Sequence, residues 1–337
     1  MKRMRAEWEK QRAVLFAFPH KDSDWVEYLS EARENFIAII KEVLRFEEVV
    51  LVYHPNDLEG RAIIEKTFSQ AIEEGRVRVY AIHCNDTWAR DFGAINLLEG
   101  DKNVLLDFGF NGWGLKFASN WDNQINSALK KNGEFSDELR AMDMILEGGS
   151  IESDGRGVIL TNTQCLLEKN RNPYLSQKEI EEKLKGHLGA KKILWLNHGY
   201  LAGDDTDSHI DTLARFISPT QIAYVSCEDE SDEHYLELKA MEEELRELRD
   251  LEGNPYELVK LPFVRAIYDE GERLPATYAN FLFVNNALLV PTYGDSNDSL
   301  ALQILQNALP HLEVVGVDCQ TLIRQHGSLH CVSMQLY

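Results

Sequence analysis

The feature that most constrains the fold is a long series of short apolar runs, separated by segments with helical periodicity. Ten runs are rich in Val, Ile, Leu and Phe and are usually bounded by Gly, Asn, Asp or Pro: 13–18, 48–53, 76–82, 103–108, 157–162, 192–196, 221–226, 256–261, 280–291 and 312–317. These lengths and boundaries predict β-strands. Strands that alternate with helices indicate an α/β protein built from repeated small units.

Four segments have the apolar spacing of amphipathic helices: 30–46, 174–189, 232–250 and 296–310. Ser30 is the expected N-cap of the first, and Ser176, Glu179 and Gly189 supply start and stop signals for the second. The third lies in the acidic stretch 228–252 and is expected to be a surface helix. Because no Gly/Ser-rich linker divides the sequence, we expect one catalytic domain over residues 1–337.

The formal net charge of −21 argues against two classes of partner. A nucleic acid backbone and an anionic membrane surface would both be repelled. The same charge would raise the local concentration of a small cation. We therefore expect a small cationic ligand, no nucleic acid and no membrane.

The cysteines and the N-terminal sequence indicate the compartment. Five cysteines, an odd number with no CxxC pair, make a disulfide framework or a zinc knuckle improbable and favour a reducing environment. No signal peptide is expected, since the basic N-terminal residues are followed only by the short apolar run 13–18. The sequence contains no run of about eighteen apolar residues, so no transmembrane helix is expected. A cytoplasmic location is the expectation.

The stretch "DDTDSHID", residues 204–211, surrounds one histidine with carboxylates. Extended backbone would place Asp205, Asp207, His209 and Asp211 on one face. A divalent metal accepts such ligands, but no second His/Asp cluster with supporting spacing completes a set. An acidic turn and a binding site for an organic cation are the two other interpretations.

Three further motifs carry polar residues beside glycines: "TWARDFGAI" at 87–95, "LEGGSIESDGRG" at 146–157 and "RQHGSLHCVSMQLY" at 324–337. Cys331 in the last is a candidate nucleophile, because a lone cysteine with a distant histidine and acids is a known catalytic combination. Asp91 and Glu147 are 56 positions apart, Glu147 and His209 are 62, and His209 and Cys331 are 122. A period near sixty with one unit skipped, at 274–286, indicates repeated units that each deliver a residue to a central site.

Taken together and in this order, "WARDFG", "EGGSIESDG", "DDTDSHID" and "GSLHC" resemble the agmatine deiminase family. That family is grouped with the bacterial-type peptidylarginine deiminases in the guanidine-modifying pentein superfamily. The runs "LTNTQCLLEKNRNP" and "YANFLFVNNALLVPTYGD" are also similar to it, so that the resemblance extends from residue 16 to residue 331. It implies a five-bladed, pseudo-symmetric α/β propeller of ββαβ units, the pentein fold. Family habit suggests a homodimer.

The resemblance also implies roles for five residues. Cys331 matches the nucleophile, His209 the general acid/base, and Glu147 the acid that pairs with the histidine. Asp91 and Asp211 match the two carboxylates that bind the guanidinium. Trp88 is expected to stack on the substrate, and Asp205 could approach its tail.

The implied reaction is the hydrolysis of agmatine to N-carbamoylputrescine and ammonia, a step of putrescine and polyamine biosynthesis, through a covalent thiouronium on Cys331. Such a hydrolase of C–N bonds in linear amidines needs no metal and no organic cofactor. Free or peptidyl arginine is the alternative substrate, with Arg90 or Arg265 as possible partners of a free carboxylate. A metal-dependent hydrolase and a non-enzymatic binding propeller are alternatives from other classes.

Overall fold

The computed structural model describes residues 2–337, and its α/β class is as expected. Five of its sheets repeat one arrangement, in which a strand pairs antiparallel with the next, and a third strand pairs parallel with the second after a helical connection. The strands are β1 Lys2–Met4, β2 Ala13–Ala17, β3 Glu48–Tyr53, β4 Val77–Ala81, β5 Ile95–Glu99, β6 Lys102–Gly109, β7 Glu138–Ile145, β8 Glu152–Ser153, β9 Val158–Asn162, β10 Lys192–Leu196, β11 Ala214–Ser218, β12 Gln221–Val225, β13 Glu257–Leu261, β14 Tyr268–Asp269, β15 Glu272–Arg273, β16 Leu282–Val284, β17 Ala287–Thr292, β18 Glu313–Asp318 and β19 Met334–Leu336.

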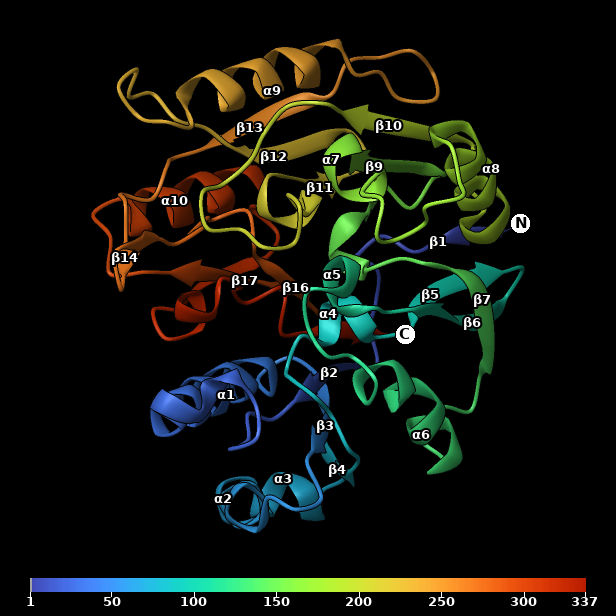
Figure 1. Cartoon of the computed structure of the whole chain (residues 1–337), viewed down its shortest axis with the longest axis vertical. Helices are drawn as coiled ribbons and strands as arrows, with labels where there is room; N and C mark the ends of the chain where they lie inside the picture. Colours follow the sequence, from blue (N-terminus) through green and yellow to red (C-terminus); the bar gives the residue numbers. More distant parts are fainter. Residues whose placement is uncertain (1) are drawn as a thin grey trace.

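The sheets have the strand orders β1-β5-β6-β7, β8-β9-β10, β11-β12-β13, β16-β17-β18 and β19-β2-β3-β4, and β14 and β15 form a separate hairpin. The last of the five sheets combines strands from both ends of the chain, because the C-terminal strand β19 pairs antiparallel with β2. This pairing brings the C-terminal end of the chain to the middle of the view in Figure 1. A closed five-bladed propeller is not confirmed by these sheets.

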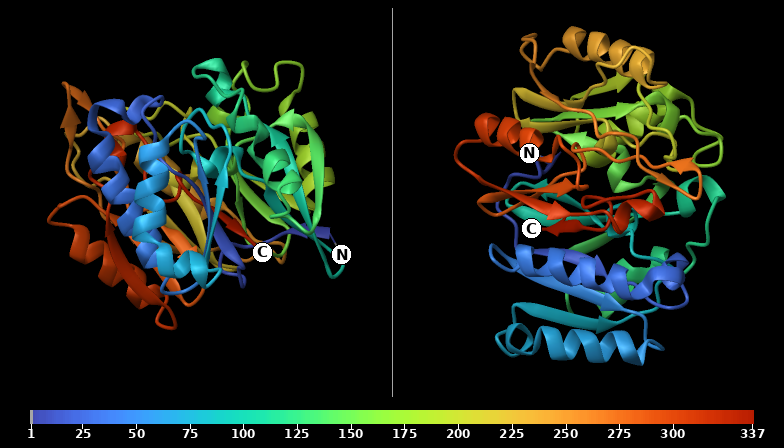
Figure 2. Two further views of the ribbon diagram at one scale, coloured as in Figure 1. Left: turned by 90° about the horizontal axis from the view of Figure 1, so that it is seen from below. Right: turned by 90° about the vertical axis from the view of Figure 1, so that its left-hand side faces the viewer.

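Most of the helices connect parallel strands, whereas α4 lies between β4 and β5, which belong to different sheets. The helices are α1 Leu29–Val43, α2 Leu58–Thr67, α3 Ser69–Glu73, α4 Ala89–Phe92, α5 Gly112–Leu115, α6 Ile125–Lys131, α7 Thr163–Leu166, α8 Gln177–Leu188, α9 Tyr235–Glu247 and α10 Asp298–Ala308, with 3-10 turns η1 Asp24–Tyr28, η2 Asp122–Gln124, η3 Gly148–Ser150, η4 Ile210–Thr212 and η5 Leu322–Gln325. The longer helices lie at the outer edge of the view in Figure 1, whereas α4 lies near its middle. Along the long axis, α9 lies at one end and α2 with α3 at the other (Figure 2).

All ten predicted strands and all four predicted helices are present. The start of α8 is as predicted, since Ser176 and Glu179 form a capping box and Gly189 ends the helix in the left-handed conformation. The N-cap expected at Ser30 is wrong. Helix α1 begins at Leu29, directly after the turn η1, and has no side-chain cap. A preceding turn that already has helical geometry leaves the first amides less in need of a cap.

Helix α9 lies over its sheet as a surface helix, as expected, and buries Leu238, Met241 and Leu245 against β10 to β12. Within residues 2–337, no helix is long and apolar enough to cross a membrane.

Candidate functional site

The predicted catalytic residues lie in corresponding places of four of the five sheets. Each comes a few residues before the strand that begins an antiparallel pair: Asp91 before β5, Glu147 before β8, His209 and Asp211 before β11, and Cys331 before β19. The segments of the first three sheets touch, because α4 contacts η3 and η3 contacts η4. In the skipped unit the matching place, before β16, is occupied by Asn280. The repeated topology is therefore what gathers the site.

Cys331 is buried, and its Sγ lies 3.3 Å from Asn280 Nδ2 and 3.9 Å from Asp211 Oδ2. Asn280 also holds the backbone of this segment, since its Oδ1 accepts hydrogen bonds from the His330 and Cys331 amides. Burial, together with the charges of Asp211 and Asp91, raises the pKa of the Cys331 thiol well above its ordinary value. Without a substrate, this sulfur is therefore a thiol at neutral pH.

Asp91 and Asp211, the two predicted guanidinium ligands, are both buried but have different partners. Asp91 Oδ2 accepts from the Trp113 indole at 2.9 Å and Oδ1 from the Gly149 amide at 3.1 Å. Burial and the neighbouring carboxylates of Asp211 and Glu147 raise the pKa of Asp91 well above its usual range. A bound cation would favour its ionised form.

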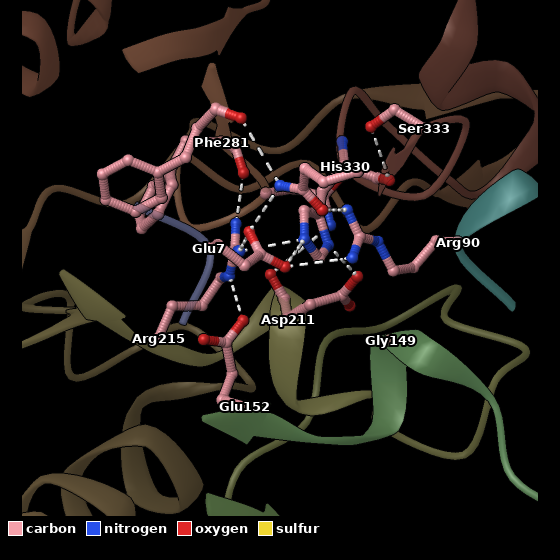
Figure 3. A network of polar contacts seen from close by, with 12 residues as sticks. Glu7, Arg90, Gly149, Glu152, Asp211, Arg215, Phe281, His330 and Ser333 are labelled. Atoms are coloured by element: carbon pink, nitrogen blue, oxygen red, sulfur yellow. Dashed lines mark hydrogen bonds and ion pairs between the residues drawn. The ribbon is translucent and has the colours of Figure 1, made fainter. Parts of the chain in front are cut away.

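Asp211 belongs to a buried polar network that Figure 3 shows. Its Oδ2 accepts from His330 Nδ1 at 2.6 Å, and its Oδ1 has no partner among the described residues. Burial raises its pKa, but the hydrogen bond and charge of His330 outweigh that effect, so that the pKa of Asp211 is lowered. Asp211 thus presents an ionised carboxylate with one free oxygen.

The rest of this network fixes His330 from the other side. Its Nε2 lies 2.8 Å from Glu7 Oε1, and the Glu7 carboxylate accepts from Arg90 and Arg215 (Figure 3). Arg215 is fully buried and also bonds Glu152. The N-terminal segment therefore helps to hold a site residue that is more than two hundred positions away.

His209 is buried, and neither ring nitrogen has a hydrogen-bond partner in residues 2–337. Its Nδ1 lies 3.6 Å from Asp91 Oδ1. Burial lowers the pKa of His209 to about 3, although the charge of Asp211 acts in the opposite direction. The imidazole is neutral at pH 7 and is free to accept a proton.

The resemblance pairs Glu147 with His209, but no hydrogen bond joins the two side chains in this structure. The two side chains are neighbours, with ligand atoms within 4.8 Å, but both Glu147 oxygens accept from Arg171 Nε, at 2.9 and 3.0 Å. Arg171 is fully buried as a side chain and also bonds Asp207 and the Thr206 carbonyl. A buried carboxylate is stabilised most by a full positive charge, so Glu147 pairs with the guanidinium rather than with the neutral imidazole.

The predicted ligands Trp88 and Asp205 both line the cavity that leads to Cys331. Trp88 is 6% exposed, packs at a centroid distance of 5.8 Å from Trp25, and lies against Gly327 so closely that a Cβ there would overlap its ring. It is therefore both a packed aromatic and part of the cavity wall. The Asp205 side chain has no hydrogen bond among the described residues, and burial raises its pKa.

The remaining acids of the 204–211 stretch are structural. The Asp204 carboxylate accepts from Thr206 and from the Ser208 amide, which closes the turn. Asp207 pairs with Lys116 and with Arg171. Asp207 and Ser208 adopt left-handed backbone conformations, so the run is not the extended segment that would place alternate side chains on one face.

The cavity wall is acidic and aromatic. Five aspartates line it: Asp24, Asp86, Asp91, Asp204 and Asp205. Trp88, Trp113 and Phe117 supply aromatic surface, and His209 and Cys331 lie on the same wall. Within the described part of the chain no lysine or arginine lines it. Such a wall attracts a cation with an apolar stem.

Gly149 lies where three site residues converge, and it leads to a prediction. A Cβ at this position would lie 2.6 Å from His209 Nδ1, 2.9 Å from Asp211 Oδ2 and 3.0 Å from Asp91 Oδ1. We expect Gly149→Ala to lower kcat/KM on agmatine by on the order of 10² or more, since displacement of reacting groups by about 1 Å has this effect. Gly186→Ala is the matched control, because a Cβ there meets nothing within 4 Å. Equal activity of the two variants would contradict the geometry.

The structure contains two groups of buried side chains close to the site that have the spacing of metal ligands. Glu147, Cys165 and His209 have ligand atoms within 4.8 Å of one another, and Glu7, Glu152 and His330 form a second such group. In both groups the carboxylates already pair with a buried arginine, Arg171 or Arg215. The acids of the 204–211 stretch do not gather around His209 as a ligand set, because Asp204 and Asp207 bind elsewhere.

Three residues of this site were missed from the sequence: Arg171, Asn280 and Trp113. The position of Asn280 could have been predicted from the sequence, because the sixty-residue period marks the segment 274–286 as the skipped unit. Arg171 lies in the run 160–173 that resembles the family, but no spacing singled out this residue. It follows α7 in a loop, and only the fold brings it to Glu147.

Comparison with known proteins identifies the family of this chain. The family model of the Porphyromonas-type peptidyl-arginine deiminase matches residues 3–336. An agmatine deiminase of Pseudomonas aeruginosa is 32% identical, with 99% of this chain and 95% of the relative covered.

Solved structures give the same result. A C. jejuni agmatine deiminase, with a cysteine-to-serine substitution and substrate bound, is 44% identical, covers 100% of this chain and 96% of its own, and superposes with a TM-score of 0.91. The agmatine deiminase of Enterococcus faecalis is 28% identical, with 99% and 95% covered and a TM-score of 0.87. The match over almost the whole length establishes that this chain belongs to the Porphyromonas-type peptidyl-arginine deiminase family.

Proposed function

We propose that this protein hydrolyses agmatine to N-carbamoylputrescine and ammonia, with Cys331 as the nucleophile. The observation that carries the proposal is the cavity wall, where five aspartates line the same cavity as a buried thiol and no lysine or arginine is found among the described lining residues. Agmatine has a guanidinium at one end, an ammonium at the other and an apolar stem between them. The agmatine deiminases of P. aeruginosa and C. jejuni named above support the same substrate.

The first half of the reaction displaces ammonia. Asp91 and the free oxygen of Asp211 hold the N–H groups of the planar guanidinium beside Cys331. The bound cation lowers the pKa of the thiol, the neutral His209 accepts its proton, and the sulfur attacks the central carbon. The imidazolium of His209 then gives the proton to the departing nitrogen, and ammonia leaves. The product of this half is a thiouronium cation on Cys331.

The second half returns the free enzyme. His209, neutral again, accepts a proton from a water molecule that attacks the thiouronium carbon. The carbon–sulfur bond breaks, the ureido product leaves, and the sulfur recovers a proton. One net proton is released to solution in this half, where it converts the ammonia already set free to ammonium. No step needs a metal or an organic cofactor.

Free arginine and peptidyl arginine fit this cavity less well. The carboxylate of free arginine would face aspartates. The two arginines considered as its partners are engaged elsewhere, since Arg90 pairs with Glu7 and Arg265 with Asp295. The decisive experiment is ammonia release from agmatine, arginine and a blocked arginine peptide at equal concentrations. Turnover of arginine or of the peptide in preference to agmatine would overturn the proposal.

The pH dependence of Cys331 reactivity follows from its environment. Because burial and two aspartates raise the thiol pKa, the thiolate fraction in the free protein should grow about tenfold per pH unit up to at least pH 9. The rate of Cys331 alkylation by iodoacetamide, followed by mass spectrometry of the Cys331 peptide, should rise accordingly without a plateau. A plateau between pH 6 and 7 would show a thiolate formed before substrate binds.

We also propose three further properties of this protein. The five sheets with a common strand order support the assignment of five ββαβ units to one pseudo-symmetric propeller and to one catalytic domain over residues 1–337. All five cysteines are free, which supports a reducing, cytoplasmic environment. Homodimer formation remains a prediction, and light scattering of the purified protein measures it.

A further inference from the structure

His330 directly precedes the nucleophile Cys331, and its ring is fully buried. Both ring nitrogens face polar groups of the protein. Nδ1 lies 2.6 Å from Asp211 Oδ2, and Nε2 lies 2.8 Å from Glu7 Oε1 and 2.9 Å from a guanidinium nitrogen of Arg215 (Figure 3). The ring therefore has no polar atom left for a substrate, and the mechanism above gives it no proton to transfer.

The contacts of the ring fix where its hydrogen lies. Because the pKa of Asp211 is lowered, its carboxylate is ionised and can only accept, so Nδ1 carries a hydrogen and donates it. Nε2 can accept from Arg215 when the ring is neutral, and it can donate to Glu7 when the ring is charged. The hydrogen bond from Nδ1 to Asp211 is the same in both states.

The surroundings of the ring are themselves held in place. Arg215 is fully buried, donates to Glu152 and to the Phe281 carbonyl, and lies over the Phe281 ring at 4.3 Å from its centroid. The His330 amide donates to Asn280 Oδ1 at 2.9 Å. Both the backbone and the imidazole of His330 are therefore fixed, and the ring is a rigid support for the carboxylate that it contacts.

Asp211 has one oxygen that is held and one that is free. Its Oδ2 accepts from His330, whereas its Oδ1 has no hydrogen-bond partner within residues 2–337. Partial rotation of the carboxylate would stretch this hydrogen bond, so the bond also fixes the direction of Oδ1. We propose that His330 is a positioning residue, whose Nδ1–H holds Asp211 so that the free oxygen is aimed at the guanidinium of the substrate. This role rests on the proposed function, because agmatine is taken as the cation that Asp211 binds.

Two substitutions separate the hydrogen bond from the bulk of the ring. The amide nitrogen of asparagine is as many bonds from Cα as Nδ1 of histidine, and that of glutamine is as many bonds away as Nε2. His330→Asn therefore keeps a donor toward Asp211, whereas His330→Gln loses it. In a Cys331→Ser background, His330→Gln should weaken agmatine binding by about tenfold or more, and His330→Asn by less than about threefold. Calorimetric titration measures both affinities.

His234→Gln is the matched control in the same background. His234 is also buried, and its Nδ1 lies 2.6 Å from a carboxylate oxygen of Asp232, but neither residue lines the cavity of Cys331. Its replacement should leave agmatine affinity unchanged. An equal loss of affinity in His234→Gln and His330→Gln would overturn the positioning role, because it would show a general effect of removing a buried imidazole.

A double-mutant cycle tests whether His330 acts through Asp211. When Asp211→Asn is already present in the Cys331→Ser background, His330→Gln should weaken agmatine binding no further, because the carboxylate that the ring holds has been removed. A residue that only supports the fold would add its full effect. Additive losses of affinity would therefore overturn the proposal.

The ring proton of His330 tests the contact without any substrate. In protein with isotope-labelled histidine, this proton should resonate far downfield, because it is donated to a buried carboxylate. The signal should be absent in His330→Gln, present in His234→Gln and shifted upfield in Asp211→Asn. If His330→Gln does not fold, the shift in Asp211→Asn is the deciding result, and an unshifted signal there would overturn the proposal.

The two proposals fail in different ways. If wild-type protein released no ammonia from agmatine, the proposed function would be overturned, while the ring-proton signal would still report the contact between His330 and Asp211. If wild-type protein turned over agmatine but His330→Gln bound it as tightly as the Cys331→Ser parent, only the positioning role would be overturned.

Discussion

Replacement of Cys331 by serine is expected to lower the turnover of agmatine by on the order of 10⁴ or more, while agmatine still binds. The hydroxyl of serine is a far weaker acid than a thiol, and neither the bound cation nor His209 can make it an effective nucleophile at neutral pH. The binding groups remain, because Asp91 and Asp211 are held by Trp113, Gly149 and His330 and not by Cys331 alone. Steady-state ammonia release and calorimetric titration with agmatine measure the two effects.

Cys319→Ser is the matched control for this prediction. Cys319 is also fully buried near the C-terminus, but it does not line the cavity. Its replacement should change activity far less than that of Cys331. If Cys331→Ser kept more than a tenth of the wild-type turnover, the nucleophile would have to be sought elsewhere.

Replacement of His209 by asparagine is expected to lower kcat by on the order of 10² to 10⁴, the range in which general acid–base groups contribute. The proposed mechanism routes both proton transfers through this ring, and its two nitrogens have no partner that competes for them within the described residues. Agmatine affinity should change little, since the carboxylates that hold the guanidinium belong to other residues. Single-turnover kinetics separate the two halves of the reaction, and both should be slowed.

The exposed His198 is the matched control for His209, and His198→Asn should leave kcat unchanged. The informative contrary result is a variant in which only the release of the ureido product is slowed. It would show that His209 serves water activation alone and that the proton on ammonia comes from another group.

Local sequence patterns predicted the strands and helix ends whose formation depends mainly on neighbouring residues. Several of the ten apolar runs bury a continuous apolar segment, as in Val49 to Val52 of β3, whereas β4, β13 and β18 are only partly buried. The capping box of α8 is likewise contained in a few residues. The strand β7 was missed because it is half exposed and its sequence, "ELRAMDMI", mixes polar and helix-forming residues. Only pairing with β6 makes it a strand.

Pairings between distant parts of the chain could not be predicted from local sequence patterns. Nothing local predicts that β19 pairs with β2, or that Glu7 reaches His330 across the chain. In the site, the motifs located Cys331, His209, Asp91 and Glu147, but not the partner of Glu147. A glutamate beside a histidine suggests a hydrogen bond between them, whereas the fold supplies the stronger competitor, Arg171.

The central claim is that Cys331 forms a covalent bond with the guanidinium carbon of agmatine. Rapid acid quenching of the wild-type protein during turnover, followed by mass spectrometry, tests it most directly. The account predicts that the Cys331 peptide gains the mass of agmatine less ammonia, and that the adduct disappears when the substrate is exhausted. Steady ammonia release with an unmodified Cys331 at every quench time, or an adduct on another residue, would contradict it.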